Sequence, residues 1–316
     1  MKPNPAILLS GLLLLGAMLR FAHAAGVEER TAVVISEGVR LQATIYTPTA
    51  AKPPLPTIIM SHGWGGTAAM LRSQATDFAQ AGYLVVAFDY RGWGESDARL
   101  VPAPAEKGVD GSLGTDVREL REIVDPLDQA MDLQNVVHWA MGEPAVDKTR
   151  LGLWGTSFSG GLVVYVAARD ARVRAVVSQV GYMGQPVATM PSSALERSYS
   201  DATRRARGEL AYPPPGAREI GNLRGAPLRE KFLLYAPVDD VARAKNCAML
   251  FIAAEKEELF DNREHPQRAY ERAKQPRKYV VIPGIAHYGI YGEAREQATG
   301  LAIEWFDRYL KNTTGQ

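Results

Sequence analysis

Short apolar segments alternate with longer helical segments along most of this chain, and this alternation constrains the fold more than any other feature. The expected strands are residues 31–36, 39–48, 56–63, 83–90, 150–155, 173–180, 247–254 and 278–284. The first two read as an antiparallel pair that turns at Glu37-Gly38. Helical patterns cover residues 68–82, 126–142, 161–170 and 295–311. The sequence therefore predicts an α/β fold, with a mostly parallel twisted sheet of about eight strands and helices on both faces.

Composition limits the size of the core and the kinds of partner. The chain has 316 residues, of which 46% are hydrophobic and 22% charged, so it can bury a large core. Its formal net charge of +1 creates no basic field that would gather phosphates, and we expect no nucleic-acid partner. Cys247 is the only cysteine, which excludes an internal disulfide and leaves packing to hold the fold.

The first 24 residues have the features of a signal peptide. Lys2 precedes an apolar run at residues 7–19, and the segment Ala22-His23-Ala24 supplies the small residues that a signal peptidase reads. We expect cleavage before Ala25, a periplasmic or secreted mature domain of residues 25–316, and no stable membrane insertion after cleavage. The apolar run is short for a membrane span, and an uncleaved N-terminal anchor is the alternative.

The rhythm of strands and helices breaks at residues 182–246, where the strand pattern stops. Long excursions inside compact domains are commonly lids or binding loops, so we expect a cap over a cleft. Between Glu196 and Lys231 this segment holds seven arginines and one lysine against five acids. One hypothesis is that these arginines recruit an anionic or strongly polar substrate, and the alternative is a set of solvated surface charges. A second long connection, residues 92–122, is a further candidate to border the site.

The segment GTSFSG, residues 155–160, falls where the strand at 150–155 ends and a helix begins. A serine at the tip of such a turn presents its hydroxyl above the sheet, in the geometry called a nucleophile elbow. Residues two positions before and after it must be small, and Gly155 and Ser159 meet this condition around Ser157. Ser157 is therefore the expected nucleophile. Ser159 is the alternative, although that choice shifts the turn into the expected helix.

A serine hydroxyl needs a base beside it to act as a nucleophile. The chain contains five histidines, and His287 follows the strand at 278–284 in a loop that carries it beyond the sheet. His287 is therefore the expected base. His62 belongs to the SHGWGGT turn, His138 lies in a helical pattern, and His265 stands in an expected surface helix or loop.

The base in turn needs a carboxylate to fix its tautomer and to stabilise the imidazolium. The loop after the strand at 247–254 contains four acids, namely Glu255, Glu257, Glu258 and Asp261. The strand at 173–180 ends without any acid. Glu257 has the best offset from its strand and is the expected partner of the base. Glu258 is the alternative, and the other two acids are expected to be solvated.

Attack by the serine creates an oxyanion that fixed donors must stabilise. The glycine-rich turn SHGWGGT follows the strand residues PTIIM, 56–60, and can aim the Trp64 backbone N–H at the nucleophile, with the Phe158 N–H as the second donor. The alternative is a plain turn or a phosphate-binding loop. No lysine follows the turn as it would in a phosphate-binding P-loop, which disfavours the latter.

Five features in this order resemble the α/β-hydrolase superfamily: SHGWGG, FDYRGWGESD, GTSFSGG, the acidic loop after FIAA, and PGIAHYG. They span nearly the whole expected mature chain, and the order serine, acid, histidine is that of the superfamily. The chain is most similar to its dienelactone-hydrolase-like and acyl-peptidase-like branch. The resemblance implies that Asp89 to Gly94 is an architectural signature. Two departures are Ser159 in place of the commoner glycine and Glu257 in place of the commoner aspartate.

These features together predict a serine hydrolase that cleaves a carboxylic ester through an acyl-enzyme intermediate. Ser157, His287 and Glu257 are the expected catalytic residues, and the Trp64 and Phe158 amides are the expected oxyanion donors. A peptidase of the same fold is the runner-up, and a catalytically inactive binding protein is a third possibility. The expected partner is a small-molecule ester or acyl compound. No metal or organic cofactor is implied, and the oligomeric state is left open.

Overall fold

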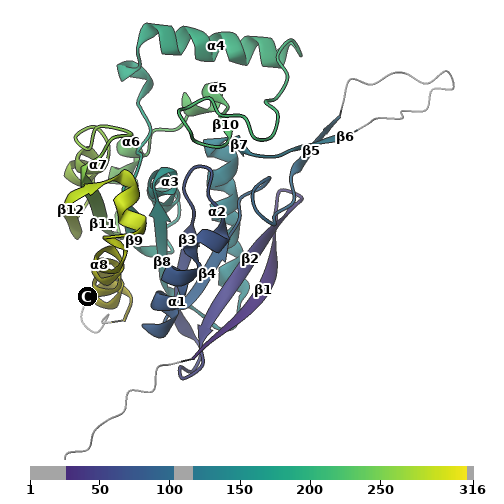
Figure 1. Ribbon diagram of the computed structural model, residues 1–316. Helices are drawn as coiled ribbons and strands as arrows, with labels where there is room; N and C mark the ends of the chain where they lie inside the picture. Colours follow the sequence, from purple (N-terminus) through teal and green to yellow (C-terminus); the bar gives the residue numbers. More distant parts are fainter. Residues whose placement is uncertain (1–25, 103–116, 312–316) are drawn as a thin grey trace, which may run out of the picture.

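The computed structural model describes residues 26–102 and 117–311, and its centre is an eight-stranded sheet (Figure 1). The strands lie in the order β1-β2-β4-β3-β8-β9-β11-β12. Their bounds are β1 Val27–Ser36, β2 Val39–Pro48, β3 Leu55–Ser61, β4 Leu84–Phe88, β8 Val146–Thr156, β9 Val173–Gln179, β11 Ala248–Lys256 and β12 Arg277–Ala286. All eight strands expected from the sequence pattern are present in this sheet.

The sheet is parallel except at one edge. β1 pairs antiparallel with β2, and β2 pairs antiparallel with β4, whereas all other neighbours run parallel. The β1–β2 hairpin turns at Glu37 and Gly38, which have φ angles of 47° and 85°. Two positive φ angles are the signature of the tight hairpin turn that matches the twist of a two-stranded ribbon. The predicted fold class is therefore confirmed.

Helices cover both faces of the sheet. The larger ones are α1 Arg72–Gln80, α2 Pro126–Gly142, α3 Phe158–Ala167, α7 Pro266–Arg272 and α8 Arg295–Phe306. A short 3-10 turn, η1 Ala68–Leu71, precedes α1, and a π-helical turn, η5 Asp307–Lys311, extends α8. One buried core contains α2, α3 and α7, and the other contains α1 and α8. Successive side chains of β8 alternate between these cores, with Leu153 in the first and Trp154 in the second, as the strand period of two requires.

Residues 182–246 leave the sheet between β9 and β11. They contain η2 Val187–Thr189, α4 Ser192–Ala206, β10 Ala226–Pro227, α5 Arg229–Phe232, α6 Pro237–Asp240 and η3 Val241–Arg243. Figure 1 shows α4 at the top of the molecule, separated from the main sheet by α5 and the short β10–β7 pair. The sequence pattern gave no sign of β10, which is two residues long and pairs with β7 (Ile123–Val124).

The other long connection, between β4 and α2, also contains short strands. β5 (Arg99–Pro102) pairs antiparallel with β6 (Val117–Leu120). Before them, the architectural signature ties two loops together, because the Asp89 carboxylate accepts the Ala68 N–H at 2.6 Å and the Glu95 N–H at 3.1 Å. The expected signal peptide, residues 1–24, lies outside the described residues. Within the described ranges, every helix is too short or too polar to cross a membrane.

Candidate active site

Ser157 lies at the tight turn between β8 and α3, in a conformation that side chains seldom adopt. Its φ is 56° and its ψ is −122°, and a positive φ is strained for residues other than glycine. The Ser157 N–H donates to the Gln179 carbonyl at 2.8 Å, and the Tyr182 N–H donates to the Ser157 carbonyl at 3.1 Å. A Cβ at Gly155 would lie 2.2 Å from the Ser159 carbonyl oxygen, so this turn requires a glycine there.

His287 and Glu257 extend from Ser157 as a chain of hydrogen bonds. His287 Nε2 lies 3.0 Å from Ser157 Oγ, and His287 Nδ1 lies 2.9 and 2.8 Å from the two Glu257 carboxylate oxygens. The side chains of His287 and Glu257 are each 1% exposed. With Glu257 as its acceptor, the ring carries its proton on Nδ1, and Nε2 is free to accept the serine proton.

The other acids of the loop after β11 have different partners. Glu258 accepts the backbone N–H of His287 at 2.7 Å. Glu255 and Asp261 are exposed, and they bond to a backbone amide and to an arginine respectively. The structure therefore brings Glu257, and not its neighbours, to the imidazole ring.

The remaining described histidines lie away from the Ser157 hydroxyl or are engaged elsewhere. His62 is buried in the turn after β3, and His138 is exposed on α2. His265 departs from the expectation of a surface position, because its ring packs on Tyr182 at 4.6 Å and on Phe260 at 4.9 Å between ring centroids. This burial lowers the pKa of His265 to about 4.

The two expected oxyanion donors lie beside the nucleophile turn. Gly63, directly before Trp64, packs so closely that a Cβ there would lie 2.8 Å from the Ser157 Cβ. Phe158 is the first residue of α3, where backbone N–H groups have no partner within the helix. Across the described residues, neither the Trp64 nor the Phe158 N–H is bonded to a backbone acceptor. Both amides are thus available to developing negative charge.

Ser159 faces the protein interior. Its side chain is fully buried, its hydroxyl donates to the His62 carbonyl, and the hydroxyl oxygen lies 2.8 Å from the Tyr90 hydroxyl. Ser159 does not line the cavity at Ser157. Of the two serines considered from the sequence, only Ser157 both lines this cavity and has an adjacent histidine.

A cavity of about 410 Å³ opens at Ser157 and His287. Its walls are mainly apolar or aromatic side chains: Trp64, Met70, Leu71, Leu223, Tyr288 and Tyr291. Among the described residues, no lysine, arginine, aspartate or glutamate lines it. Leu223 comes from the 182–246 segment, so this segment contributes one wall of the cavity.

The arginines of that segment are largely engaged with acids instead of facing the cavity. Arg205 pairs with Glu230 at 2.5 Å, and Arg229 pairs with Glu219 at 2.5 Å. Arg224 pairs with Glu122. These contacts favour a structural role for the arginines and give no support to the hypothesis that they recruit an anionic substrate.

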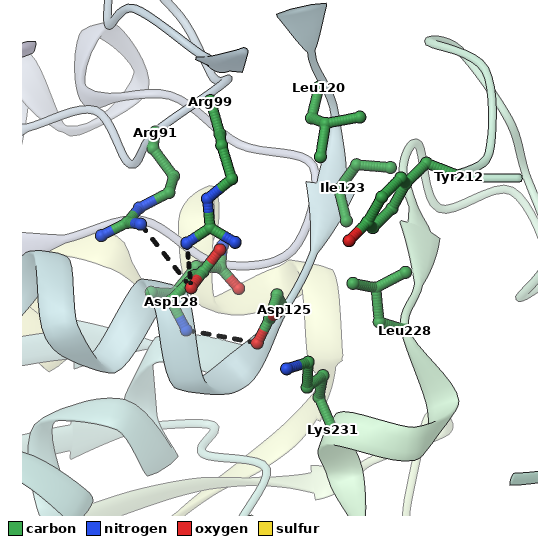
Figure 2. Close-up of a pocket in the computed structure, with 10 residues that line it drawn as sticks. Arg91, Arg99, Leu120, Ile123, Asp125, Asp128, Tyr212, Leu228 and Lys231 are labelled. Carbon is green, nitrogen blue, oxygen red and sulfur yellow. Dashed lines mark hydrogen bonds and ion pairs between the residues drawn. The ribbon is translucent and has the colours of Figure 1, made fainter. Parts of the chain in front are cut away.

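A second cavity lies where the 182–246 segment meets the α/β core (Figure 2). Arg91 and Arg99 point at the same carboxylate, that of Asp128, at 3.6 and 2.8 Å, while Lys231 approaches Asp125 from the opposite side. The volume of this cavity is about 40 Å³, close to the share of one water molecule in the liquid, about 30 Å³. It is too small for a substrate, unlike the cavity at Ser157.

Sequence reasoning missed two tyrosines that border His287. Tyr288 and Tyr291 belong to the short turn η4 (His287–Tyr291), with ring centroids 5.3 and 6.3 Å from the imidazole. The Tyr291 hydroxyl lies 2.9 Å from Thr156 Oγ1, and burial raises the Tyr291 pKa to about 12. The available signal was the spacing of three residues between Tyr288 and Tyr291, directly after the histidine, because side chains three residues apart lie on the same side of a helical turn. The described residues hold no cluster of three or more potential metal ligands.

Comparisons with known proteins agree with this architecture. The model of the X-Pro dipeptidyl-peptidase (S15) family matches residues 37–189. The chain is 28% identical to an uncharacterized 31.7 kDa protein of the traX-finO intergenic region of Escherichia coli, over 87% of this chain and 98% of that protein. It is 34% identical to the quorum-quenching protein AidA of Acinetobacter baumannii, over 46% of this chain and 41% of AidA.

A solved structure shows the same fold over nearly the whole chain. The alpha/beta hydrolase GrgF from Penicillium sp. superposes with a TM-score of 0.69 at 19% identity, covering 90% of this chain and 99% of GrgF. This likeness agrees with the mostly parallel eight-stranded sheet and its covering helices. The chain therefore has the α/β-hydrolase fold.

Proposed function

We propose that this protein is a serine hydrolase that cleaves a carboxylic ester through an acyl-enzyme intermediate. The observation that carries this proposal is the continuous hydrogen-bonded chain from Ser157 through His287 to Glu257, at 3.0 Å and 2.8 Å. Such a chain converts a weakly nucleophilic hydroxyl into an activated one, because the base that takes its proton is already in contact and correctly oriented.

The proposed reaction has two halves. His287 Nε2 takes the Ser157 proton as Oγ attacks the ester carbonyl, and Glu257 stabilises the imidazolium that forms. The Trp64 and Phe158 amides hold the tetrahedral oxyanion, and each such donor contributes about 3 kcal/mol to lowering the barrier. His287 then protonates the departing alcohol. In the second half a water molecule gives its proton to His287, attacks the acyl-enzyme, and releases the carboxylic acid and free Ser157.

The cavity walls favour a neutral small molecule with an apolar acyl or alcohol group. Burial of apolar surface against Met70, Leu71 and Leu223 would drive binding. The cavity volume of about 410 Å³ falls within the range of small-molecule binding sites, about 300–1,000 Å³. A charged group would lose its hydration there without gaining a counter-ion among the described lining residues.

A peptidase is the second candidate, favoured by the match to the X-Pro dipeptidyl-peptidase family model. An enzyme that removes dipeptides must bind a protonated N-terminal amine, which calls for an acidic partner. The described cavity lining contains no free carboxylate, since Glu257 is occupied by His287 and buried. This absence favours the ester over the peptide. An inactive binding protein would have no need of the strained Ser157 turn and its aligned histidine.

Turnover of a graded substrate panel tests this proposal. We expect the purified protein to hydrolyse p-nitrophenyl esters, with the highest kcat/KM for neutral acyl chains that fit the cavity. Aminoacyl-p-nitroanilides and X-Pro-p-nitroanilides should be hydrolysed far more slowly. Faster turnover of an X-Pro anilide than of every ester would favour the peptidase, and turnover of neither class would favour a binding protein.

We also propose that the protein is exported and acts in the periplasm or medium. The support is the sequence of residues 1–24, with Lys2, the apolar run and the Ala22-His23-Ala24 segment.

A further inference from the structure

We propose that Ser159 is a positioning residue that aims the oxyanion donor of Trp64 by tying the nucleophile turn to the loop after β3. The inference rests on the proposed serine hydrolase function and assigns a role to the residue that departs from the glycine common in similar turns. Ser159 does not touch the substrate cavity, so its hydroxyl acts through the backbone that it holds.

The direction of the hydrogen bonds around Ser159 follows from counting protons. Ser159 has one hydroxyl proton, and the His62 carbonyl can only accept. The contact between Ser159 Oγ and the Tyr90 hydroxyl at 2.8 Å must therefore be donated by Tyr90. Tyr90 is fully buried, which raises the pKa of its hydroxyl and keeps its proton in place. The chain of donors thus runs from Tyr90 to Ser159 to the His62 carbonyl.

The carbonyl that Ser159 holds is one peptide away from the oxyanion donor. The His62 carbonyl belongs to the peptide that enters Gly63, and the Gly63 carbonyl belongs to the same peptide group as the Trp64 N–H. That second carbonyl accepts the Gly66 N–H at 3.1 Å and lies 3.0 Å from His62 Nδ1. Bonds on both sides of Gly63 thus fix the direction of the Trp64 amide, and Ser159 supplies the only one that comes from the nucleophile turn among the described residues.

Gly63 makes this anchoring necessary. A Cβ at Gly63 would lie 2.8 Å from the Ser157 Cβ, so close packing against the nucleophile excludes any side chain at this position. Glycine also gives the backbone its greatest conformational freedom, at the point where the direction of a single N–H matters. The hydroxyl of Ser159, on the first turn of α3, restricts the backbone at Gly63 without occupying the cavity.

Loss of this anchor should impair the transition state and spare substrate binding. An oxyanion donor acts only when it is aimed at the position that the oxyanion will occupy, whereas the ground-state carbonyl gains little from it. We expect Ser159→Ala to lower kcat by roughly 10-fold to 100-fold, the range expected from a misplacement of up to about 1 Å. KM should stay within about 2-fold of the wild-type value.

The experiment compares Ser159→Ala with Thr57→Val, using kcat, KM and the inhibition constant of a trifluoromethyl ketone. Thr57 is a matched control, because its fully buried hydroxyl also donates to a backbone carbonyl, that of Leu55 at 3.0 Å, but lies at the far end of β3. The ketone forms a tetrahedral adduct with Ser157 whose oxyanion needs the Trp64 amide. In Ser159→Ala its inhibition constant should rise by the same factor as kcat falls, and in Thr57→Val it should not change.

Three outcomes decide the proposal. The proposal is supported if Ser159→Ala loses kcat and ketone binding by the same factor and keeps its KM. If Ser159→Ala does not fold, Ser159→Cys, which keeps the size of the side chain but donates weakly, must show the same pattern. Wild-type kcat and ketone binding in a folded Ser159 variant would overturn the role of Ser159 alone. A wild-type protein that hydrolyses no ester would overturn the proposed function and this role with it.

Discussion

The Glu258 carboxylate accepts the backbone N–H of His287 at 2.7 Å, while the adjacent residue, Glu257, accepts the imidazole Nδ1–H of the same histidine. Two consecutive acids therefore hold one histidine, the first by its ring and the second by its main chain. Only the bond to the ring controls which nitrogen carries the proton. The two glutamates should consequently differ in their effect on turnover.

Replacement of Glu257 by glutamine should cripple turnover without unfolding the protein. A neutral amide neither stabilises the imidazolium nor fixes the tautomer, and the corresponding loss in a Ser-His-Asp enzyme is on the order of 10⁴ in kcat. We expect a loss of about 10³-fold to 10⁴-fold in kcat with an unchanged circular dichroism spectrum. Steady-state kinetics on the best p-nitrophenyl ester measures this.

Glu258→Gln is the matched control for Glu257→Gln. The amide oxygen of glutamine can still accept the His287 N–H, so kcat should stay within about 3-fold of the wild-type value. An inactive Glu258→Gln together with an active Glu257→Gln would identify Glu258 as the acid that orients His287. Two active variants would mean that another group orients the histidine.

Charge on the substrate should reduce turnover. The described walls of the Ser157 cavity contain no arginine or lysine, and Arg205, Arg224 and Arg229 are paired with glutamates. An ester with a terminal carboxylate should therefore have a lower kcat/KM than its neutral analogue of equal length. The ratio of the two kcat/KM values should change little between 20 mM and 500 mM salt, because no cation in the cavity wall attracts the carboxylate. Attraction by exposed arginines would weaken strongly over this range, since the Debye length falls from about 20 Å to about 4 Å. Preference for the carboxylate ester at low salt would restore the recruitment hypothesis.

Stability should decrease as the pH falls through the range set by His265. Burial lowers its folded-state pKa to about 4, below the usual value of about 6.5. Between these two pH values the unfolded chain binds more protons than the folded chain. The contribution of neutral His265 to the free energy of unfolding is therefore complete above pH 6.5 and is lost progressively down to about pH 4. The full contribution is at most roughly 3 kcal/mol.

Urea denaturation at several pH values measures that loss. His265→Gln should flatten the fall in unfolding free energy between pH 6.5 and pH 4, because the titrating group is gone. His138→Gln is the matched control for the substitution itself, since His138 is exposed on α2. An unaltered slope in His265→Gln would contradict the assignment of this stability to His265.

N-terminal sequencing of the exported protein tests the proposed localisation. Protein recovered from the periplasm or medium should begin at Ala25, after removal of residues 1–24. Replacing Ala24 by a bulky residue should block processing, because the peptidase reads small residues there. A full-length chain that stays with the membrane fraction in the unaltered protein would identify the segment as an anchor.

The strands of the main sheet could be predicted because each is a local apolar run bounded by turn residues. The two-residue strands β7 and β10 could not, since so short a segment has no period to detect. The positions of Ser157 and His287 followed from strand ends, which meet at one edge of a parallel sheet. Their catalytic roles remain predictions until they are measured.

Several contacts at the site depend on how distant loops meet, and no sequence pattern encodes them. Leu223 reaches the cavity from a turn shortly before β10, and the Ser159 hydroxyl donates to a carbonyl 97 residues earlier in the chain. His265 looked like a surface residue because its neighbours in sequence are charged. Its burial comes from Tyr182, which the segment after β9 brings to it, and from Phe260 of its own loop.

Trapping of the acyl-enzyme tests the central claim most directly. The protein is mixed with excess p-nitrophenyl ester, quenched with acid within milliseconds to seconds, digested, and mapped by mass spectrometry. The account predicts an acyl group on the peptide at Ser157, localised to that residue by fragmentation, and no adduct in Ser157→Ala. An acyl group on Ser159, or steady ester turnover in Ser157→Ala, would contradict it.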